Sequence, residues 1–225
     1  DLSSVTNMSR MFNKATSFNS DIGDWDVSNV TDMSYLFAFA KAFNQDLDNW
    51  DVSNVTNMRE MFNQAHAFNS SVDWDVSNVE DMAGMFFHSL AFNQDISGWD
   101  TSSVTNMYRM FNDAESFDQN LGAWDIGNVT NMEIMFFDSE LSTPNYDATL
   151  IGWAIDSSGT PGDETDDVPT DITFDGGSSK YCNGATARGK LIDSYGWTIA
   201  DGGSDCALFI TKWMVQAGET ITIPT

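Results

Sequence analysis

Aspartate recurs along this chain at an almost constant interval, and no other pattern in the sequence is better suited to chemistry. The column consists of residues spaced 24 or 25 positions apart: Asp1, Asp26, Asp51, Asp75, Asp100 and Asp125. Two positions further on, a small residue recurs in step: Ser3, Ser28, Ser53, Ser77, Ser102 and Gly127. Carboxylates held about 5 Å apart repel by roughly 0.8 kcal/mol per pair in water. Such a column therefore requires some compensating interaction.

Calcium is one source of that compensation, because the ion takes about six to eight oxygen ligands from carboxylates, carbonyls and water. A metal site would be built from the same column: Asp26, Asp51, Asp75, Asp100 and Asp125. A second interpretation needs no ion, since each carboxylate can accept hydrogen bonds from the nearby serine and backbone in an Asx-type turn. Direct contact with a ligand is the third. No EF-hand or glycine-rich calcium loop occurs in the repeats, and we favour the Asx-type turn.

Other catalytic constellations are weak. The two histidines, His66 and His88, occupy variable positions, and neither has cysteine or a carboxylate at metal-ligand spacing. We interpret them as surface residues. No glycine-rich phosphate loop and no serine flanked as a strained nucleophile is present. A glycosidase needs two differently tuned carboxylates, and a column repeated in every unit singles out none, so we expect no enzyme activity.

The aspartates belong to a repeat that fills most of the chain. Its fullest copies are Trp25–Met33 and Trp50–Met58, and further copies start at Trp74, Trp99 and Trp124. A period of this length is typical of a solenoid, in which each repeat stacks on its neighbours. We expect six coils over residues 1–140.

Each coil should begin with a short strand. Trp25 and Val27 alternate with period two, which predicts that both side chains face inward while Asp26 and Ser28 face outward. Stacked coils would line these strands into a parallel sheet. The outward surface, which we name the Asp–Ser face, would carry the same residues in every coil.

The second predicted element of each coil is a helix of about two turns. Apolar residues follow the i, i+3, i+4, i+7 spacing at Met33, Leu36, Phe37 and Ala40. Thr31 is placed to act as the N-cap. A column of asparagines in the return segments predicts a hydrogen-bonded ladder: Asn19, Asn44, Asn69 and Asn93, followed by Asp118.

These repeats resemble the BspA-like leucine-rich-repeat surface proteins, a family that includes short acidic repeats first catalogued as a domain of unknown function in mycoplasmas. The resemblance rests on Trp-Asp-Val-Ser-Asn-Val-Thr-Asn-Met, Met-Phe-Asn-x-Ala and Phe-Asn-Gln-Asp within residues 1–140. It implies an α/β, leucine-rich-repeat-like solenoid on secreted or surface-anchored bacterial proteins, often associated with adhesion. Here Trp and Met stand where a typical leucine-rich repeat has Leu. The resemblance implies no single ligand.

The C-terminal third breaks the pattern and predicts capping coils over residues 141–207. Thr143 as N-cap and Pro144 at the first helical position start a helix. A strand over 172–175, a helix over 185–195 and a strand over 197–199 follow an acidic loop, Asp163–Asp167. Atypical terminal repeats commonly cover the open end of such a stack. The tail, 208–225, has strand-like character, and we expect it to open a following module of a longer, multidomain surface protein.

The amino-acid composition argues against some classes of binding partner. The formal net charge of −25 argues against binding to nucleic-acid phosphates or anionic membranes. No run of about 18 apolar residues is present, so we expect no membrane insertion. Cys182 and Cys206 would suit a disulfide in an extracellular protein, and two reduced buried thiols are the alternative. We expect an extracellular or cell-surface location.

The function expected from these features is non-catalytic recognition or adhesion, with a protein or polysaccharide of a host or neighbouring cell as the partner. A polysaccharide would match the uniform Asp–Ser face. A protein would use the variable opposite face, whose side chains are of hot-spot type: Tyr35, Arg59, Tyr108 and Arg109. A passive spacer is the alternative function, and an unrecognised carbohydrate-active enzyme is the third.

Overall fold

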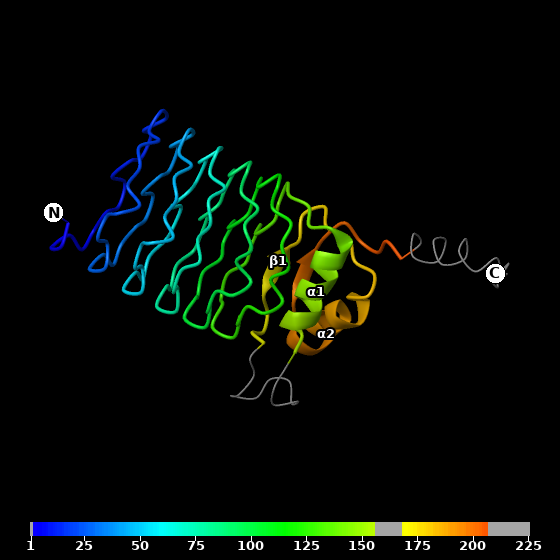
Figure 1. Ribbon diagram of the computed structural model, residues 1–225. Helices are drawn as coiled ribbons and strands as arrows, with labels where there is room; N and C mark the ends of the chain where they lie inside the picture. Colours follow the sequence, from blue (N-terminus) through cyan, green and yellow to red (C-terminus); the bar gives the residue numbers. More distant parts are fainter. Residues whose placement is uncertain (1, 156–167, 207–225) are drawn as a thin grey trace, which may run out of the picture.

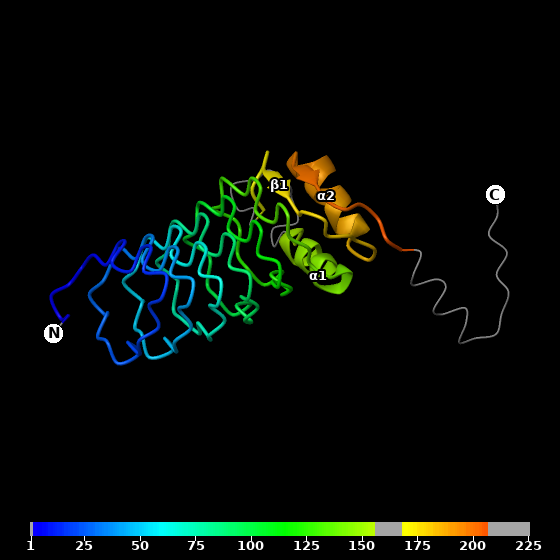
Figure 2. The same ribbon diagram turned by 90° about the horizontal axis from the view of Figure 1, so that it is seen from above.

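The computed structural model describes residues 2–155 and 168–206. Residues 2–141 wind through coils that lie side by side in one row, and the regular helices and strands gather at its C-terminal end (Figure 1). Those elements are α1 (Thr143–Trp153), β1 (Thr173–Asp175), α2 (Ala185–Tyr195) and β2 (Thr198–Ala200). Seen from above, α1 and α2 lie beyond the last coil (Figure 2). Asp1, the acidic loop Asp163–Asp167 and the tail 208–225 lie outside the described residues.

Neighbouring coils are joined by backbone hydrogen bonds at four alternate positions. In the second coil, four N–H groups donate to carbonyls of the third coil at 2.7–2.9 Å: Met33 to Asn57, Tyr35 to Arg59, Phe37 to Met61 and Phe39 to Asn63. The N–H groups between them close turns within the coil, such as Leu36 to Met33 at 3.1 Å. Single parallel bridges run along the row through Asn7, Asp32, Asn57, Asp81, Asn106 and Asn131.

This ladder occupies the segment for which the spacing predicts a helix, and that prediction is wrong. An α-helix requires N–H groups to bond four residues back, whereas here every second N–H bonds the next coil. Tyr35 and Phe39 adopt positive φ values of 58° and 63°, which end any helical path. A series of tight turns brings the same side chains inward at the same spacing. Thr31 is therefore not an N-cap, and its hydroxyl donates to the carbonyl of Thr6 at 3.2 Å.

No strand forms at Trp25–Val27, so this prediction is also wrong. Within the described coils, the parallel bridges lie at the Asp32 column, five residues after Val27. The tryptophans bond between coils through their side chains instead. Each indole Nε1–H donates to a carbonyl of the preceding coil at 2.9–3.1 Å: Trp50 to Ile22, Trp74 to Leu47, Trp99 to Val72 and Trp124 to Ile96.

Two rows of stacked phenylalanines form the core of the coils. The first row has ring centroids 5.3–5.7 Å apart: Phe12, Phe37, Phe62, Phe86, Phe111 and Phe136. The second has centroids 5.7–6.0 Å apart: Phe18, Phe43, Phe68, Phe92 and Phe117. From Phe37 onward no ring of either row is more than 1 % exposed. This burial of aromatic surface is the main stabilisation available to segments with so little regular structure.

The C-terminal elements continue and close the row. Phe136 donates its N–H to Asp175 of β1 at 3.0 Å, and β1 pairs in parallel with β2. Trp153 of α1 donates to the carbonyl of Leu121 at 2.9 Å, as the coil tryptophans do. Phe174 meets Phe136 edge-on, at 86° and 6.1 Å, so the parallel stacking ends here.

The helices and strands predicted after residue 141 agree with the structure better than those predicted for the coils. The predicted helix over 185–195 is confirmed by α2, and the predicted strands match β1 and β2 to within one residue at each end. α1 begins at Thr143, with Ser142 as N-cap, so the predicted N-cap lies one residue too late. A disulfide joins Cys182 to Cys206, whose Cα atoms are 4.8 Å apart.

Candidate functional site

The Asp–Ser face consists of small hydrogen-bonded turns. Asp51 Oδ1 accepts from the N–H of Ser53 at 3.1 Å and from its hydroxyl at 2.6 Å. The same pair of bonds occurs in three other coils, at Asp26, Asp75 and Asp100. Asp125 accepts only from the N–H of Gly127, at 2.9 Å. These bonds are those expected for an Asx-type turn.

The serine bonds also affect the titration of three members of the column. They lower the pKa of Asp26, Asp51 and Asp100, because the hydroxyl and the backbone N–H stabilise the ionised carboxylate. At Asp51 the charge of Asp26 raises the pKa, but it is the weakest of the causes. Each carboxylate is thus stabilised inside its own turn. Among the described residues, no group of three or more His, Cys, Asp or Glu side chains is placed to hold a metal ion.

The second candidate surface is the variable one, which we name the turn face. It is formed by the side chains that point away from the core within residues 9–17, 34–42, 59–67, 83–91, 108–116 and 133–140. Two positions in each coil have left-handed backbone. The first column has φ of 48–62°: Arg10, Tyr35, Glu60, Gly84, Arg109 and Ile134. The second has φ of 53–64°: Lys14, Phe39, Gln64, His88, Asp113 and Asp138.

Glycine suits this backbone conformation, yet Gly84 is the single glycine in the two columns. A side chain in the left-handed region costs about 1–2 kcal/mol per residue. These are also the positions at which the side chain changes from coil to coil. Strain of this kind persists only where the surroundings impose it, and it concentrates at functional sites.

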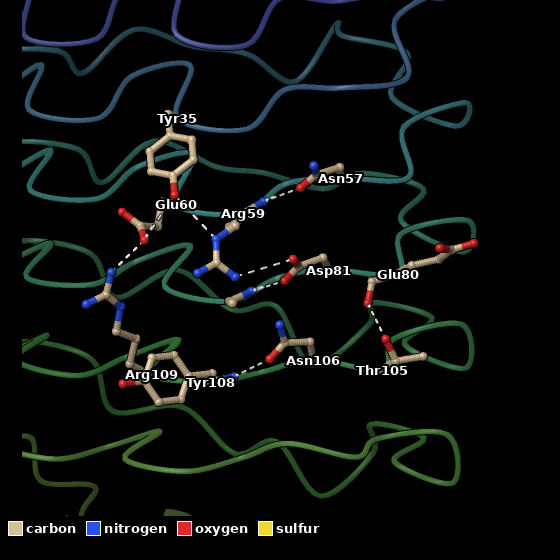
Figure 3. A network of polar contacts seen from close by, with 11 residues as sticks. Tyr35, Asn57, Arg59, Glu60, Glu80, Asp81, Thr105, Asn106, Tyr108 and Arg109 are labelled. Carbon is tan, nitrogen blue, oxygen red and sulfur yellow. Dashed lines mark hydrogen bonds and ion pairs between the residues drawn. The ribbon is translucent and has the colours of Figure 1, made fainter.

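Three of the four predicted contact residues come together on the turn face around a carboxylate (Figure 3). Arg109 Nη2 donates to Glu60 Oε1 at 2.5 Å, although the two residues are 49 positions apart. Tyr35 donates its hydroxyl proton to the same oxygen at 3.5 Å, and Arg59 Nε donates to the Tyr35 hydroxyl at 3.4 Å. Arg59 also pairs with Asp81 at 3.6 Å. The Tyr35 hydrogen bond is the main reason that the pKa of Arg59 is raised, and burial opposes it.

The fourth predicted residue, Tyr108, lies beside this network. The guanidinium of Arg109 stands over its ring at 5.7 Å, and over Phe87 at 4.8 Å. Glu60, at the centre, is only 6 % exposed. The role of Glu60 carries no signal in the sequence, because nothing in its local spacing relates it to a residue two coils away.

Gly84 makes the long reach of Arg109 possible. A Cβ atom there would lie 2.9 Å from Glu60 Cγ and 3.3 Å from Arg109 Nε. A side chain at this position would therefore shift Glu60 and press on the guanidinium of Arg109, which crosses the fourth coil to reach Glu60. Gly84 is the single glycine in a column of larger residues. That exception is visible in the sequence and is consistent with a side chain, here Arg109, crossing this coil.

The two histidines are not isolated. His66 and His88 lie in adjacent coils with ring centroids 5.0 Å apart. His88 Nδ1 pairs with Asp113 Oδ2 of the next coil. Burial lowers the pKa of His66, and the charges of Lys41 and His88 act in the same direction. Both rings are partly buried members of the turn face, with contacts that their sequence spacing did not indicate.

The C-terminal part of the structure, residues 142–155 and 168–206, which we name the cap, holds two polar clusters. Neither cluster was predicted from the sequence. The buried carboxylate of Asp147 accepts three backbone N–H groups at the start of α2, from Cys182, Asn183 and Gly184, at 2.7–2.9 Å. Asp201 accepts from Arg188 Nε at 2.7 Å and from the Tyr146 hydroxyl at 2.9 Å. Burial and the charge of Asp201 raise the pKa of Tyr146. Both carboxylates are fully engaged within the fold, so these clusters stabilise the cap.

Comparison with known proteins gives a family without an assigned activity. The pattern described as "Mycoplasma protein of unknown function, DUF285" matches residues 1–73 and 71–157. No curated protein and no solved structure matches the chain. In the described part of the chain, neither helix has the length and apolar character needed to cross a membrane. Two successive matches span all the coils and α1, and the chain therefore belongs to the DUF285 family of repeat-containing proteins.

Proposed function

We propose that the chain is a non-catalytic recognition or adhesion module of a secreted or cell-surface bacterial protein, and that it binds a protein partner through the turn face. The resemblance to BspA-like leucine-rich-repeat proteins supports the surface location, and we propose that the row of coils is a solenoid related to theirs. A rigid row presents its side chains in fixed relative positions, so that contacts from successive coils can add.

One observation carries this proposal. The variable side chains of the turn face stand on left-handed backbone, as at Tyr35 and Arg109, with φ of 58° and 48°. A sequence optimised for stability alone would place glycine there. Tyr and Arg are instead the residue types that dominate binding energy in protein interfaces. Retaining them at strained, partly exposed positions is expected if they contact a partner.

The Asp–Ser face is less suited to a specific protein partner, because it presents the same turn in every coil. It fits a ligand with its own repeat, such as a polysaccharide, with or without calcium bridging to the carboxylates. These are the competing outcomes of the test.

The test is a binding screen against arrayed proteins and glycans, with and without calcium. Two variants divide the surfaces: Arg59→Ala with Tyr108→Ala on the turn face, and Asp51→Asn with Asp100→Asn on the Asp–Ser face. Neither Arg59 nor Tyr108 has left-handed backbone, so alanine adds no strain there. We expect protein hits that the turn-face variant loses and the Asp–Ser variant keeps.

Other results assign the chain differently. Calcium-dependent glycan hits lost only in the Asp–Ser variant would move binding to that face. No hits from the wild-type chain would favour a passive spacer. Release of products from an arrayed glycan would show an enzyme.

A further inference from the structure

The net charge of the turn face falls steadily along the row of coils. The first coil contributes two positive charges, Arg10 and Lys14, and the second contributes one, Lys41. The third is neutral, because it carries one positive and one negative residue, Arg59 and Glu60. The fourth has no charged residue within 83–91 when His88 is neutral, although Asp81, just before this range, pairs with Arg59. The fifth is negative by one, because Asp113 and Glu115 exceed Arg109. The sixth is negative by three: Glu133, Asp138 and Glu140.

This gradient is confined to the turn face. The chain as a whole carries a net charge of −25, yet all the lysines and arginines of the coils lie on the turn face. These five residues are Arg10, Lys14, Lys41, Arg59 and Arg109. The charges at its two ends are accessible. Arg10, Lys14 and Lys41 are exposed at one end. At the other end Glu115, Asp138 and Glu140 line a common cavity of about 270 Å³.

We propose that the turn face binds a second copy of the chain in antiparallel orientation, with the first coil of one copy against the sixth coil of the other. This deepens the proposed function, on which it rests, by naming the partner. A two-fold axis between the third and fourth coils makes the interface self-complementary, as two-fold dimers require. Each basic coil then meets an acidic or neutral one, and electrostatic complementarity of this kind fixes orientation and partner choice.

In this antiparallel pair, the coils that face each other at the two ends carry opposite charges. Arg10 and Lys14 face the three carboxylates of the sixth coil. Lys41 faces Asp113 and Glu115. Partly exposed aromatic rings lie among these charges on the same face, as in the centres of protein interfaces: Tyr35, Phe39, Phe87, Tyr108 and Phe137.

The acidity of the remaining surface does not prevent this pairing. At physiological ionic strength the screening length is about 8 Å. Charges on the far side of each copy therefore contribute little, while opposed charges across the interface are close enough to interact. The turn face is also the surface of the coils on which like-charge repulsion between copies is lowest.

Charge reversal in two variants tests the proposal. The first variant is Arg10→Glu with Lys14→Glu, and the second is Glu133→Lys with Glu140→Lys. Each alone places like charges together at both ends of the antiparallel pair. An equimolar mixture restores opposite charges at both ends, because the acidic first coil of one variant meets the basic sixth coil of the other. Recovery in the mixture also shows that both variants are folded.

The measurement is molar mass by sedimentation equilibrium over a range of concentrations. We expect the wild-type chain to rise from 24.9 kDa toward a dimer as concentration increases. Each variant alone should associate about a hundredfold more weakly, and the mixture should recover. A control variant, Asp48→Lys with Asp73→Lys, adds the same charge as the second variant at exposed positions outside the turn face, and should dimerise as well as wild type.

Three results would overturn the proposal: a wild-type mass that stays at 24.9 kDa, growth beyond a dimer, or a mixture no better than its components. A monomeric wild type that still binds another protein, lost on Arg59→Ala with Tyr108→Ala, would remove self-association and leave the recognition function standing.

Discussion

Gly84 provides the sharpest test of how the turn face is held together. Its Cβ position lies 2.9 Å from Glu60 Cγ and 3.3 Å from Arg109 Nε, and its φ is +62°. Gly84→Ala therefore has two costs. Alanine in the left-handed region costs about 1 kcal/mol. The added Cβ also shifts Glu60 and crowds Arg109, which disrupts their charge-assisted hydrogen bond, worth about 1.5–3 kcal/mol.

We expect Gly84→Ala to lower the free energy of unfolding by about 3 kcal/mol in total. For a chain of this size that corresponds to a fall in melting temperature of roughly 6–12 °C. Urea unfolding followed by tryptophan fluorescence measures the free-energy change. Gly98→Ala is the matched control, because a Cβ there has nothing within 4 Å, and its effect should stay within about 0.5 kcal/mol.

A double-mutant cycle separates the two costs. In an Arg109→Ala background the hydrogen bond to Glu60 is already absent, so Gly84→Ala should cost about 1.5–3 kcal/mol less than in the wild type. The backbone cost and the shift of Glu60 Cγ remain. Equal costs in the two backgrounds would refute the proposed crossing of Arg109 over the fourth coil. So would a cost for Gly98→Ala as large as that for Gly84→Ala.

Three further predictions concern the cap and the Asp–Ser face. Asp147→Asn should destabilise the start of α2 by about 2 kcal/mol, since the carboxylate accepts three N–H groups there; hydrogen exchange at Cys182 should accelerate, and unchanged exchange would contradict this. Reducing the Cys182–Cys206 disulfide, which spans 24 residues, should cost about 3.5 kcal/mol, seen as a lower urea midpoint; equal midpoints with and without reductant would disprove it. Ser102→Ala should raise the pKa of Asp100 toward its ordinary value in an NMR titration. The folded-state pKa of Asp100 is lowered, so its stabilising effect is present above about pH 4 and is lost as the pH falls through that lowered pKa. The variant should therefore lose less stability on acidification, and identical acid sensitivity would contradict the assignment.

The core of the coils could be predicted because its residues repeat in type and spacing. Phe37 and Phe62 recur at the period of the repeat, and stacking one coil on the next is the only way to bury both. The asparagine ladder was predicted for the same reason and is confirmed: Asn44 donates its N–H to Asn19 Oδ1 at 2.8 Å, and Asn69 donates to Asn44 Oδ1 at 2.9 Å. The end of α2 carries a local signal too, since Gly196 at φ 73° is a typical C-cap.

The local conformation of the coils could not be predicted, because inward spacing alone does not separate a helix from consecutive turns. Met33 and Phe37 face the core in either case. The feature that distinguishes the two is left-handed backbone at Tyr35 and Phe39, and neither residue type signals it. Bonding to the next coil, which imposes that conformation, is not visible in a single repeat.

The candidate site was predicted only in part, for a related reason. Tyr35, Arg59 and Arg109 were identified by residue type, which is a local property. Their meeting point at Glu60 depends on contacts across as many as 49 residues. Such a contact follows from the stacking of the coils rather than from any motif.

The ladder of backbone hydrogen bonds has a mechanical consequence. The donor–acceptor directions run from one coil to the next, for example from Phe37 N–H to Met61 O at 2.9 Å. Tension applied between the two ends of the row would therefore pull along these bonds. In this unzipping geometry the junctions between coils break one after another, whereas in a shear geometry all the bonds would have to break together. Each coil that peels away would release about 80–90 Å of extended chain. A row built in this way yields stepwise under pulling and can lengthen severalfold as successive coils open.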